Sequence, residues 1–185
     1  MNSRTVRIAN LFTKIVKKAT AAEILHGVEV GVWEGEMSSQ LLKVCPNMQL
    51  TMVDSYVPYD DPKLGIRPLD NMHDALRAAA EATAFAADRR TMLICTSARA
   101  SLMVPDGSQD YVYLDACHKY EFVKQDLQFW YPKVRSGGVF GGHDYDGRGD
   151  RRGWFGVKKA VDEWCKETDH TVTKASGNVW WVVKK

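Results

Sequence analysis

The chain has 185 residues, with 25 lysines and arginines against 23 aspartates and glutamates. That length predicts a single domain over residues 1–185 with a substantial core. The near-balance of charge gives no indication of nucleic-acid binding. No apolar run approaches the roughly 20 residues that cross a bilayer, and the first residues lack the apolar core of a secretory signal. The four cysteines form no C-x-x-C pair, which favours a reduced intracellular protein. Together with the missing apolar run, this leads us to expect a cytoplasmic protein that does not bind membranes.

Residues 1–26 are expected to contain an amphipathic helix, because Ile8, Leu11, Phe12 and Ile15 recur at helical spacing. We favour a helix that covers the edge of the core over one that lies on a membrane surface. Short apolar runs then alternate with helical patterns. The expected strands cover residues 27–32, 49–54, 90–96, 110–115 and 137–144. The expected helices cover residues 36–45, 69–87, 119–134 and 156–167, with a short irregular helix after the third strand. Residues 170–175 and 179–185 flank a Ser-Gly-Asn turn and predict an antiparallel hairpin.

This alternation predicts an α/β fold with a mostly parallel sheet and helices on both faces. Ligands of such sheets bind beyond the carboxyl ends of the strands. The residues at those ends are therefore the first candidates for a site: the turn from Gly31 to Gly35, Asp54, Thr96 with Ser97, Asp115, and His143 with Asp144.

The turn after the first strand reads E-V-G-V-W-E-G from Glu29 to Gly35. Its glycines let backbone approach a ligand closely. The spacing does not fit the dinucleotide fingerprint G-x-G-x-x-G, and Glu29 and Glu34 would repel a phosphate, which disfavours a nicotinamide dehydrogenase. S-adenosylmethionine (SAM), which carries a sulfonium and an ammonium, suits an acidic turn better. Asp54 is placed to accept both hydroxyls of a ribose, or alternatively to cap a turn.

Two motifs in order resemble class I SAM-dependent methyltransferases. The first is E-x-G-x-x-x-G at Glu29 to Gly35, and the second runs from D-A-C-H-K-Y-E at Asp115 through D-L-Q-F-W to G-G-H-D-Y at Tyr145. The second is similar to the branch that contains small-molecule and sugar O-methyltransferases. The resemblance covers roughly residues 28–183. It implies a Rossmann-like, seven-stranded sheet in the order 3-2-1-4-5-7-6, with strand 7 antiparallel.

The resemblance also implies an activity and a set of cofactor contacts. The activity would be SAM-dependent transfer of a methyl group (EC 2.1.1.-) to an oxygen of a small molecule or sugar. A non-catalytic SAM-binding protein of the same fold is the alternative. The implied contacts are Glu29, Gly31, Trp33 and Gly35 at the methionine part, Asp54 at the ribose, Ser97 and Ala98 beside the adenine, and Asp115 under the methyl donor.

Asp115, His143 and Asp144 end adjacent expected strands, and both Asp and His bind divalent cations. The arrangement resembles metal-dependent O-methyltransferases, in which carboxylates at these ends bind Mg²⁺. The first residue of that family's strand 5 pair is usually a carboxylate or amide, whereas here it is His143, and nitrogen suits Mg²⁺ less well. Either these three residues hold Mg²⁺ or another divalent cation, or His143 and Asp144 are structural caps. The candidate catalytic residues are His143, Asp115 and His118, although His118, at a helix start, can equally be a cap-region residue, or it can be a ligand.

Residues 146–156 are glycine-rich, basic and aromatic. We expect a mobile substrate loop there, with a solvated connection as the alternative. Arg148, Arg151 and Arg152 would attract an anionic or polyhydroxylated acceptor, and Trp154 would offer a flat surface to a ring. The expected partner is thus a small-molecule acceptor, and the sequence leaves the oligomeric state open.

Overall fold

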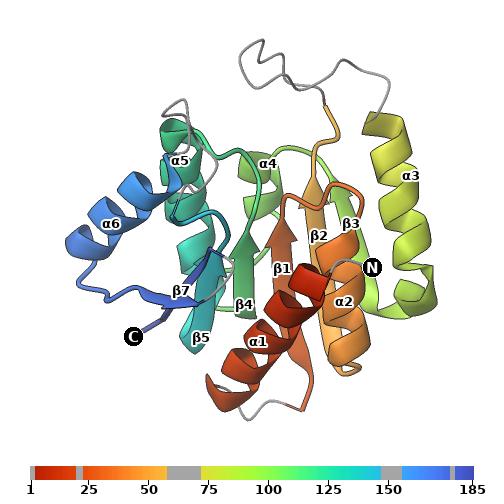
Figure 1. Cartoon of the computed structure of the whole chain (residues 1–185), viewed down its shortest axis with the longest axis horizontal. Coiled ribbons are helices and arrows are strands. Elements are labelled where there is room, and N and C mark those ends of the chain that lie inside the picture. The colour runs from red at the N-terminus through yellow and green to blue at the C-terminus, as the bar shows by residue number, and fades with distance from the viewer. Residues whose placement is uncertain (1–2, 20–22, 58–71, 147–155, 176–177) are drawn as a thin grey trace.

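Seven strands form one mixed sheet in this computed structural model, which describes residues 3–19, 23–57, 72–146, 156–175 and 178–185 (Figure 1). The strands are β1 (Leu25–Val30), β2 (Met48–Asp54), β3 (Arg90–Ile94), β4 (Gln109–Leu114), β5 (Val134–Gly142), β6 (Thr173–Ala175) and β7 (Val179–Val183). Their order is β3-β2-β1-β4-β5-β7-β6. The pairs among β1 to β5 are parallel, and β7 runs antiparallel to both β5 and β6. The predicted fold class and strand order are confirmed.

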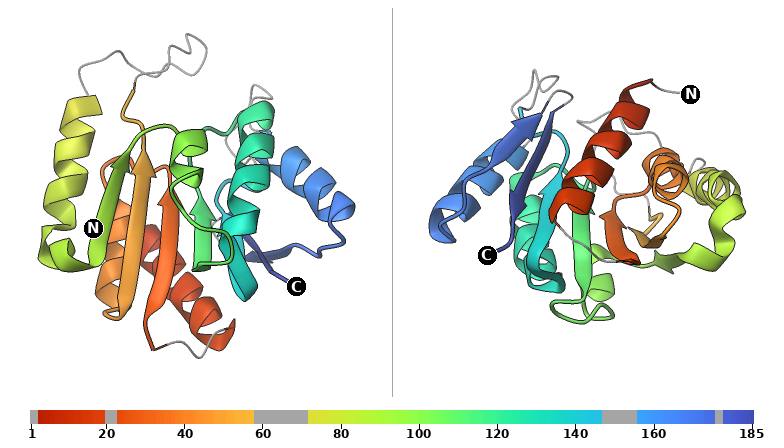
Figure 2. Two further views of the ribbon diagram at one scale, coloured as in Figure 1. Left: turned by 180° about the vertical axis from the view of Figure 1, so that it is seen from behind. Right: turned by 90° about the horizontal axis from the view of Figure 1, so that it is seen from below.

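Helices cover both faces of the sheet. They are α1 (Ser3–Ala19), α2 (Glu36–Val44), α3 (Met72–Ala82), α4 (Ser97–Ser101), α5 (Tyr120–Trp130) and α6 (Val157–Glu167), with 3-10 turns η2 (Ala84–Arg89) and η3 (Tyr131–Lys133). Figures 1 and 2 show α1, α2 and α3 on one face and α4, α5 and α6 on the other. Side chains along β4 alternate between the two layers: Tyr111 and Tyr113 pack beneath α1, whereas Val112 and Leu114 face α5.

The N-terminal helix α1 packs one apolar face on the core. Of the predicted positions, Ile8 and Phe12 are buried and Leu11 and Ile15 are half-buried, and Val16 is buried beside them. The ring of Phe12 meets the rings of Tyr111 and Tyr113 with centroids 5.7 and 4.8 Å apart. Within the described part of the chain, none of the helices combines the length and the apolar composition that crossing a bilayer requires.

Two predicted helices are shorter than expected, each for a local reason. The helix predicted over 69–87 ends as α3 at Ala82, where the hydroxyl of Thr83 donates to the carbonyl of Ala79 at 2.7 Å, and a kinked 3-10 segment follows. The helix predicted over 119–134 ends as α5 at Trp130, because Pro132 has no N–H to continue it. Residues 69–71 lie outside the described part of the chain.

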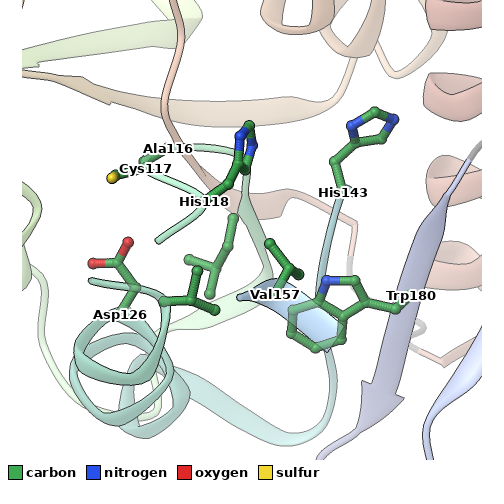
Figure 3. Close-up of a pocket in the computed structure, with 9 residues that line it drawn as sticks. Ala116, Cys117, His118, Asp126, His143, Val157 and Trp180 are labelled. Atoms are coloured by element: carbon green, nitrogen blue, oxygen red, sulfur yellow. The ribbon is translucent and has the colours of Figure 1, made fainter. Parts of the chain in front are cut away.

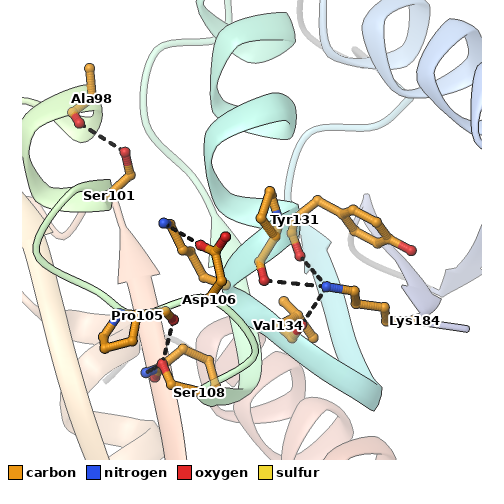
Figure 4. Close-up of polar contacts among 11 residues, drawn as sticks. Ala98, Ser101, Pro105, Asp106, Ser108, Tyr131, Val134 and Lys184 are labelled. Atoms are coloured by element: carbon orange, nitrogen blue, oxygen red, sulfur yellow. Dashed lines mark hydrogen bonds and ion pairs between the residues drawn. The ribbon is translucent and has the colours of Figure 1, made fainter.

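Lys184 ties the end of the chain to the start of β5. Its Nζ donates to the carbonyl oxygens of Tyr131, Pro132 and Val134 at 3.2, 3.3 and 2.7 Å (Figure 4). Desolvation lowers the pKa of this ammonium. Its contacts secure the amino ends of the strands, at the edge opposite to the predicted site.

Candidate active site

The turn between β1 and α2 contains both glycines of the first motif, and contacts within the chain require them. Gly31 has φ 92°, and a Cβ there would lie 2.3 Å from the backbone oxygen of Asp115. Gly35 has φ 76°, and a Cβ there would lie 2.8 Å from Cα of Ala79. The sequence interpretation assigned these glycines to a ligand. The structure shows that close packing against the end of β4 and against α3 already selects glycine.

Glu29 is buried in this turn region, although a charged side chain in a strand can equally face solvent. It is 2% exposed and accepts a hydrogen bond from the hydroxyl of Ser38 on α2. Burial is the main reason that the pKa of Glu29 is raised to about 8, and the nearby charges of Asp115 and Asp54 act in the same direction. Glu29 therefore does not face solvent. Ser38 was not predicted; it lies in the first turn of α2, directly after the motif.

Asp54 ends β2 and holds the turn together. Its Oδ2 accepts the backbone N–H groups of Val32 and Trp33 at 2.9 and 3.0 Å, and its Oδ1 accepts that of Tyr56 at 2.9 Å. A carboxylate offers about four acceptor positions. The turn-capping alternative is thus realised, and in this geometry Asp54 keeps room for about one further donor. Trp33, also predicted at the cofactor, is 46% exposed on this turn.

Ser97 and Ala98 begin α4 directly after β3. The hydroxyl of Ser97 donates to Asp126 and accepts the indole N–H of Trp130 at 2.8 Å, whereas Ala98 is exposed. Asp126 is 8% exposed, and burial raises its pKa to about 6. The sequence analysis missed Asp126, but the Asp126–Trp130 spacing of four residues indicates a shared helix face.

Asp115, His118, His143 and Asp144 converge at the carboxyl ends of β4 and β5; we call these four residues the Asp/His cluster. Leu114 and Gly142 are paired in the sheet, so the residues that follow them lie side by side. Nε2 of His118 lies 3.3 Å from Oδ1 of Asp115 and 3.3 Å from Oδ2 of Asp144. Nδ1 of His143 lies 3.7 and 3.1 Å from the same two oxygens. His118, for which the sequence left a cap, a base and a ligand as alternatives, thus shares the carboxylates of the predicted metal ligands.

Two cavities border the Asp/His cluster. A cleft of about 280 Å³ lies between α1, the β1–α2 turn and the ends of β4 and β5, and both Asp115 and His143 line it. Three further carboxylates line this cleft, from Glu29, Glu34 and Glu36. A second cavity of about 10 Å³ is lined by His118 and His143, whose imidazoles lie at the same end of it in Figure 3, and by the indole of Trp180. The cluster is therefore reachable from the acidic cleft.

The predicted substrate loop lies mostly outside the described residues. These exclude 147–155, and with them Arg148, Arg151, Arg152 and Trp154. The described end of the segment, Gly156, donates its N–H to the carbonyl of His118 at 2.7 Å. A Cβ on Gly156 would lie 2.3 Å from Cα of Tyr120. The start of α6 is thus packed against the backbone that carries His118.

Residues 28–145 match the family described as "Methyltransferase domain". The chain belongs to this methyltransferase family. The matched segment contains the β1–α2 turn, Asp54 and the entire Asp/His cluster. No curated protein is significantly similar in sequence to this methyltransferase.

Solved structures share the fold of this methyltransferase at low sequence identity. A Staphylococcus aureus protein assigned as a caffeoyl-CoA O-methyltransferase is 15% identical, with a TM-score of 0.70 over 97% of this chain and 83% of that one. The O-methyltransferase TomG from Streptomyces achromogenes, solved with SAM, is 13% identical, with a TM-score of 0.69 over 100% and 82%. PaMTH1 from Podospora anserina, solved with S-adenosylhomocysteine (SAH), is 12% identical, with a TM-score of 0.67 over 100% and 89%. Family and fold together support a class I SAM-dependent methyltransferase.

Proposed function

We propose that this chain transfers a methyl group from SAM to an oxygen of a small molecule or sugar. The observation that carries the proposal is the shared cleft. One cavity of about 280 Å³ is lined by the β1–α2 turn, where the family motif implies the donor, and by Asp115 and His143 of the Asp/His cluster, which can activate an acceptor. A methyl donor and an acceptor bound in this cavity would therefore lie next to each other.

The residues of the cleft fit SAM. Carboxylates from Glu34, Glu36 and Asp115 line it, and they complement a ligand that carries a sulfonium and an ammonium. In this proposal Glu29, Gly31, Trp33 and Gly35 surround the methionine part, and Asp54 accepts from the ribose. By the family resemblance, the adenine would lie beside Ser97 and Ala98.

The chemistry leaves the protein two tasks. SAM, when bound, supplies a methyl group that its sulfonium already activates, and the displacement is in line, so the cleft must align the acceptor oxygen with the methyl carbon and sulfur. The second task is to remove the proton of the acceptor hydroxyl. Asp115 and His143 line the cleft at the point where that hydroxyl would enter.

Two routes for the proton fit the Asp/His cluster. In the first, Asp115, His143 and Asp144 hold a divalent cation, which would supply Lewis acidity to the acceptor hydroxyl. In the second, His143 is the general base. Its Nδ1 lies 3.1 Å from Oδ2 of Asp144, a contact that orients the imidazole so that Nε2 takes the proton. We favour the cation route because two carboxylates from adjacent strand ends share the cluster.

The test is turnover with a panel of hydroxylated acceptors, combined with SAM binding. His143→Ala and Asp115→Asn should each lose turnover, and His143→Ala should retain SAM binding. Asp106→Ala, at the opposite edge of the sheet, is the control and should behave as wild type. Turnover that survives EDTA undiminished would eliminate the cation route. Full activity in both variants would contradict both routes, and SAM binding without transfer to any acceptor would favour the non-catalytic alternative.

A further inference from the structure

The second motif contains a stretch, D-L-Q-F-W from Asp126 to Trp130, whose role the sequence left open. Its two end residues lie on one face of α5 and are buried, with 8% and 0% of their surface exposed. Both contact the hydroxyl of Ser97, which begins α4 just after β3 and is half-buried. A buried carboxyl and a buried indole N–H thus meet one hydroxyl that solvent still reaches.

The chemistry of these two partners fixes the direction of both hydrogen bonds. An indole N–H only donates, so the 2.8 Å bond from Nε1 of Trp130 occupies one lone pair of the Ser97 oxygen. Burial raises the pKa of Asp126 to about 6, and above that pH its carboxylate only accepts, so the hydroxyl hydrogen of Ser97 points to Oδ1 of Asp126. Among the described residues these are the two partners of the hydroxyl. Ser97 therefore keeps one lone pair, and no hydrogen, for a ligand.

Ser97 lies where the proposed function expects the base of the methyl donor. Ile94, the last residue of β3, pairs with Asp54, which is expected at the ribose, and Ser97 begins the next helix at the same edge of the sheet (Figure 1). Asp126 also lines the small cavity together with Ala116 of the loop after β4 (Figure 3). Asp126 therefore borders both α4 and that loop, from a position behind Ser97.

We propose that Asp126 determines the specificity for the base of the methyl donor, because it holds the Ser97 hydroxyl as a pure hydrogen-bond acceptor. The exocyclic amino group of adenine donates hydrogen bonds, so it complements the remaining lone pair of Ser97. A carbonyl oxygen at the same place on the base, as in hypoxanthine, only accepts, and it would face that lone pair with no hydrogen between them. Asp126 acts through Ser97 and is thus a positioning residue. The inference rests on the proposed function and names the group of the donor that is recognised.

The test compares the binding of SAH with that of S-inosylhomocysteine, which carries hypoxanthine in place of adenine. In calorimetry at pH 8, where Asp126 is ionised, the wild type should bind SAH about 10-fold or more tightly than the inosine analogue. Ser97→Ala removes the acceptor and should weaken the binding of SAH, so that the two affinities become similar. Asp126→Leu frees the hydroxyl hydrogen to turn toward a carbonyl, which should strengthen the binding of the analogue.

Glu121→Leu is the matched control, because it removes an exposed carboxyl from the same helix, and it should keep the wild-type ratio of affinities. A purely structural role of Asp126 would weaken both ligands alike and leave that ratio unchanged. Thermal unfolding checks that each variant folds.

Two results would overturn the inference while the proposed function stands. The first is equal affinity of the wild type for SAH and the inosine analogue. The second is a wild-type ratio in Ser97→Ala or in a folded Asp126→Leu variant. Absence of SAH binding by the wild type would overturn both the inference and the proposed function, so the two failures are distinguishable.

Discussion

Two buried carboxyl groups, Glu29 and Asp126, link the site to the stability of the fold. Burial raises the pKa of Glu29 from 4.5 to about 8 and that of Asp126 from 3.8 to about 6. A raised pKa means that the folded state binds the proton more tightly than the unfolded state. The bound proton therefore stabilises the folded state fully at a pH below the unfolded-state pKa. This stabilisation is lost as the pH rises through the folded-state pKa.

Glu29→Gln should remove the larger of these two pH dependences. The amide keeps an acceptor for Ser38 and carries no charge, so the variant should gain stability relative to wild type at pH 8.5, and much less at pH 5.5. Urea unfolding at the two pH values measures the difference. Glu34→Gln, on the exposed part of the same turn, is the matched control. An equal effect of Glu29→Gln at both pH values would show that the Glu29 carboxyl does not titrate in this window.

Asp54→Ala should weaken SAM binding for two separable reasons. The variant loses at least one charge-assisted hydrogen bond to the ribose, worth about 1.5–3 kcal/mol. It also frees the backbone N–H groups of Val32, Trp33 and Tyr56, which loosens the turn. Calorimetry with SAM measures the two effects together, and unfolding without ligand measures the loosening of the turn alone, with Asp106→Ala as the control. An unchanged dissociation constant would remove Asp54 from the cofactor site.

At the scale of elements, Lys184, directly after β7, binds η3 and the start of β5 through three carbonyl oxygens. Lys184→Met keeps most of the aliphatic stem but removes the donors, and we expect a loss of about 1–3 kcal/mol in the free energy of unfolding. Lys185→Met, which loses only an exposed pair with Asp169, should change stability little. Equal unfolding midpoints for the two variants would contradict this role of Lys184.

The elements themselves were largely predictable, because apolar periodicity reflects which face of a strand or helix is buried. The strands that end at the site were found by their apolar runs and by the polar or glycine residues that follow them. The ends of α3 and α5 were not found, because they depend on a side-chain hydrogen bond of Thr83 and on the missing N–H of Pro132. Asp126 was missed because an acidic residue in a helix ordinarily indicates an exposed face, and only the tertiary contact with Ser97 explains its burial.

At the scale of the whole molecule, the order of the strands decides which residues share a site. The parallel pairs β1–β4 and β4–β5 bring Gly31, Asp115 and His143 to one edge, although 112 residues separate the first from the last (143 − 31). The motif resemblance predicted that edge. It did not predict that Asp54 binds the turn, or that His118 shares both carboxylates with His143, since these contacts depend on side-chain orientation in the folded chain.

The most direct test of the central claim is parallel calorimetry of the unmodified protein with SAM, SAH and NAD. An acidic cleft beside a glycine turn without a phosphate-binding fingerprint should bind SAM and SAH, each at one site per chain, and should give no binding heat with NAD. Binding of NAD, or the absence of binding by both SAM and SAH, would contradict the assignment of this cleft to a methyl donor.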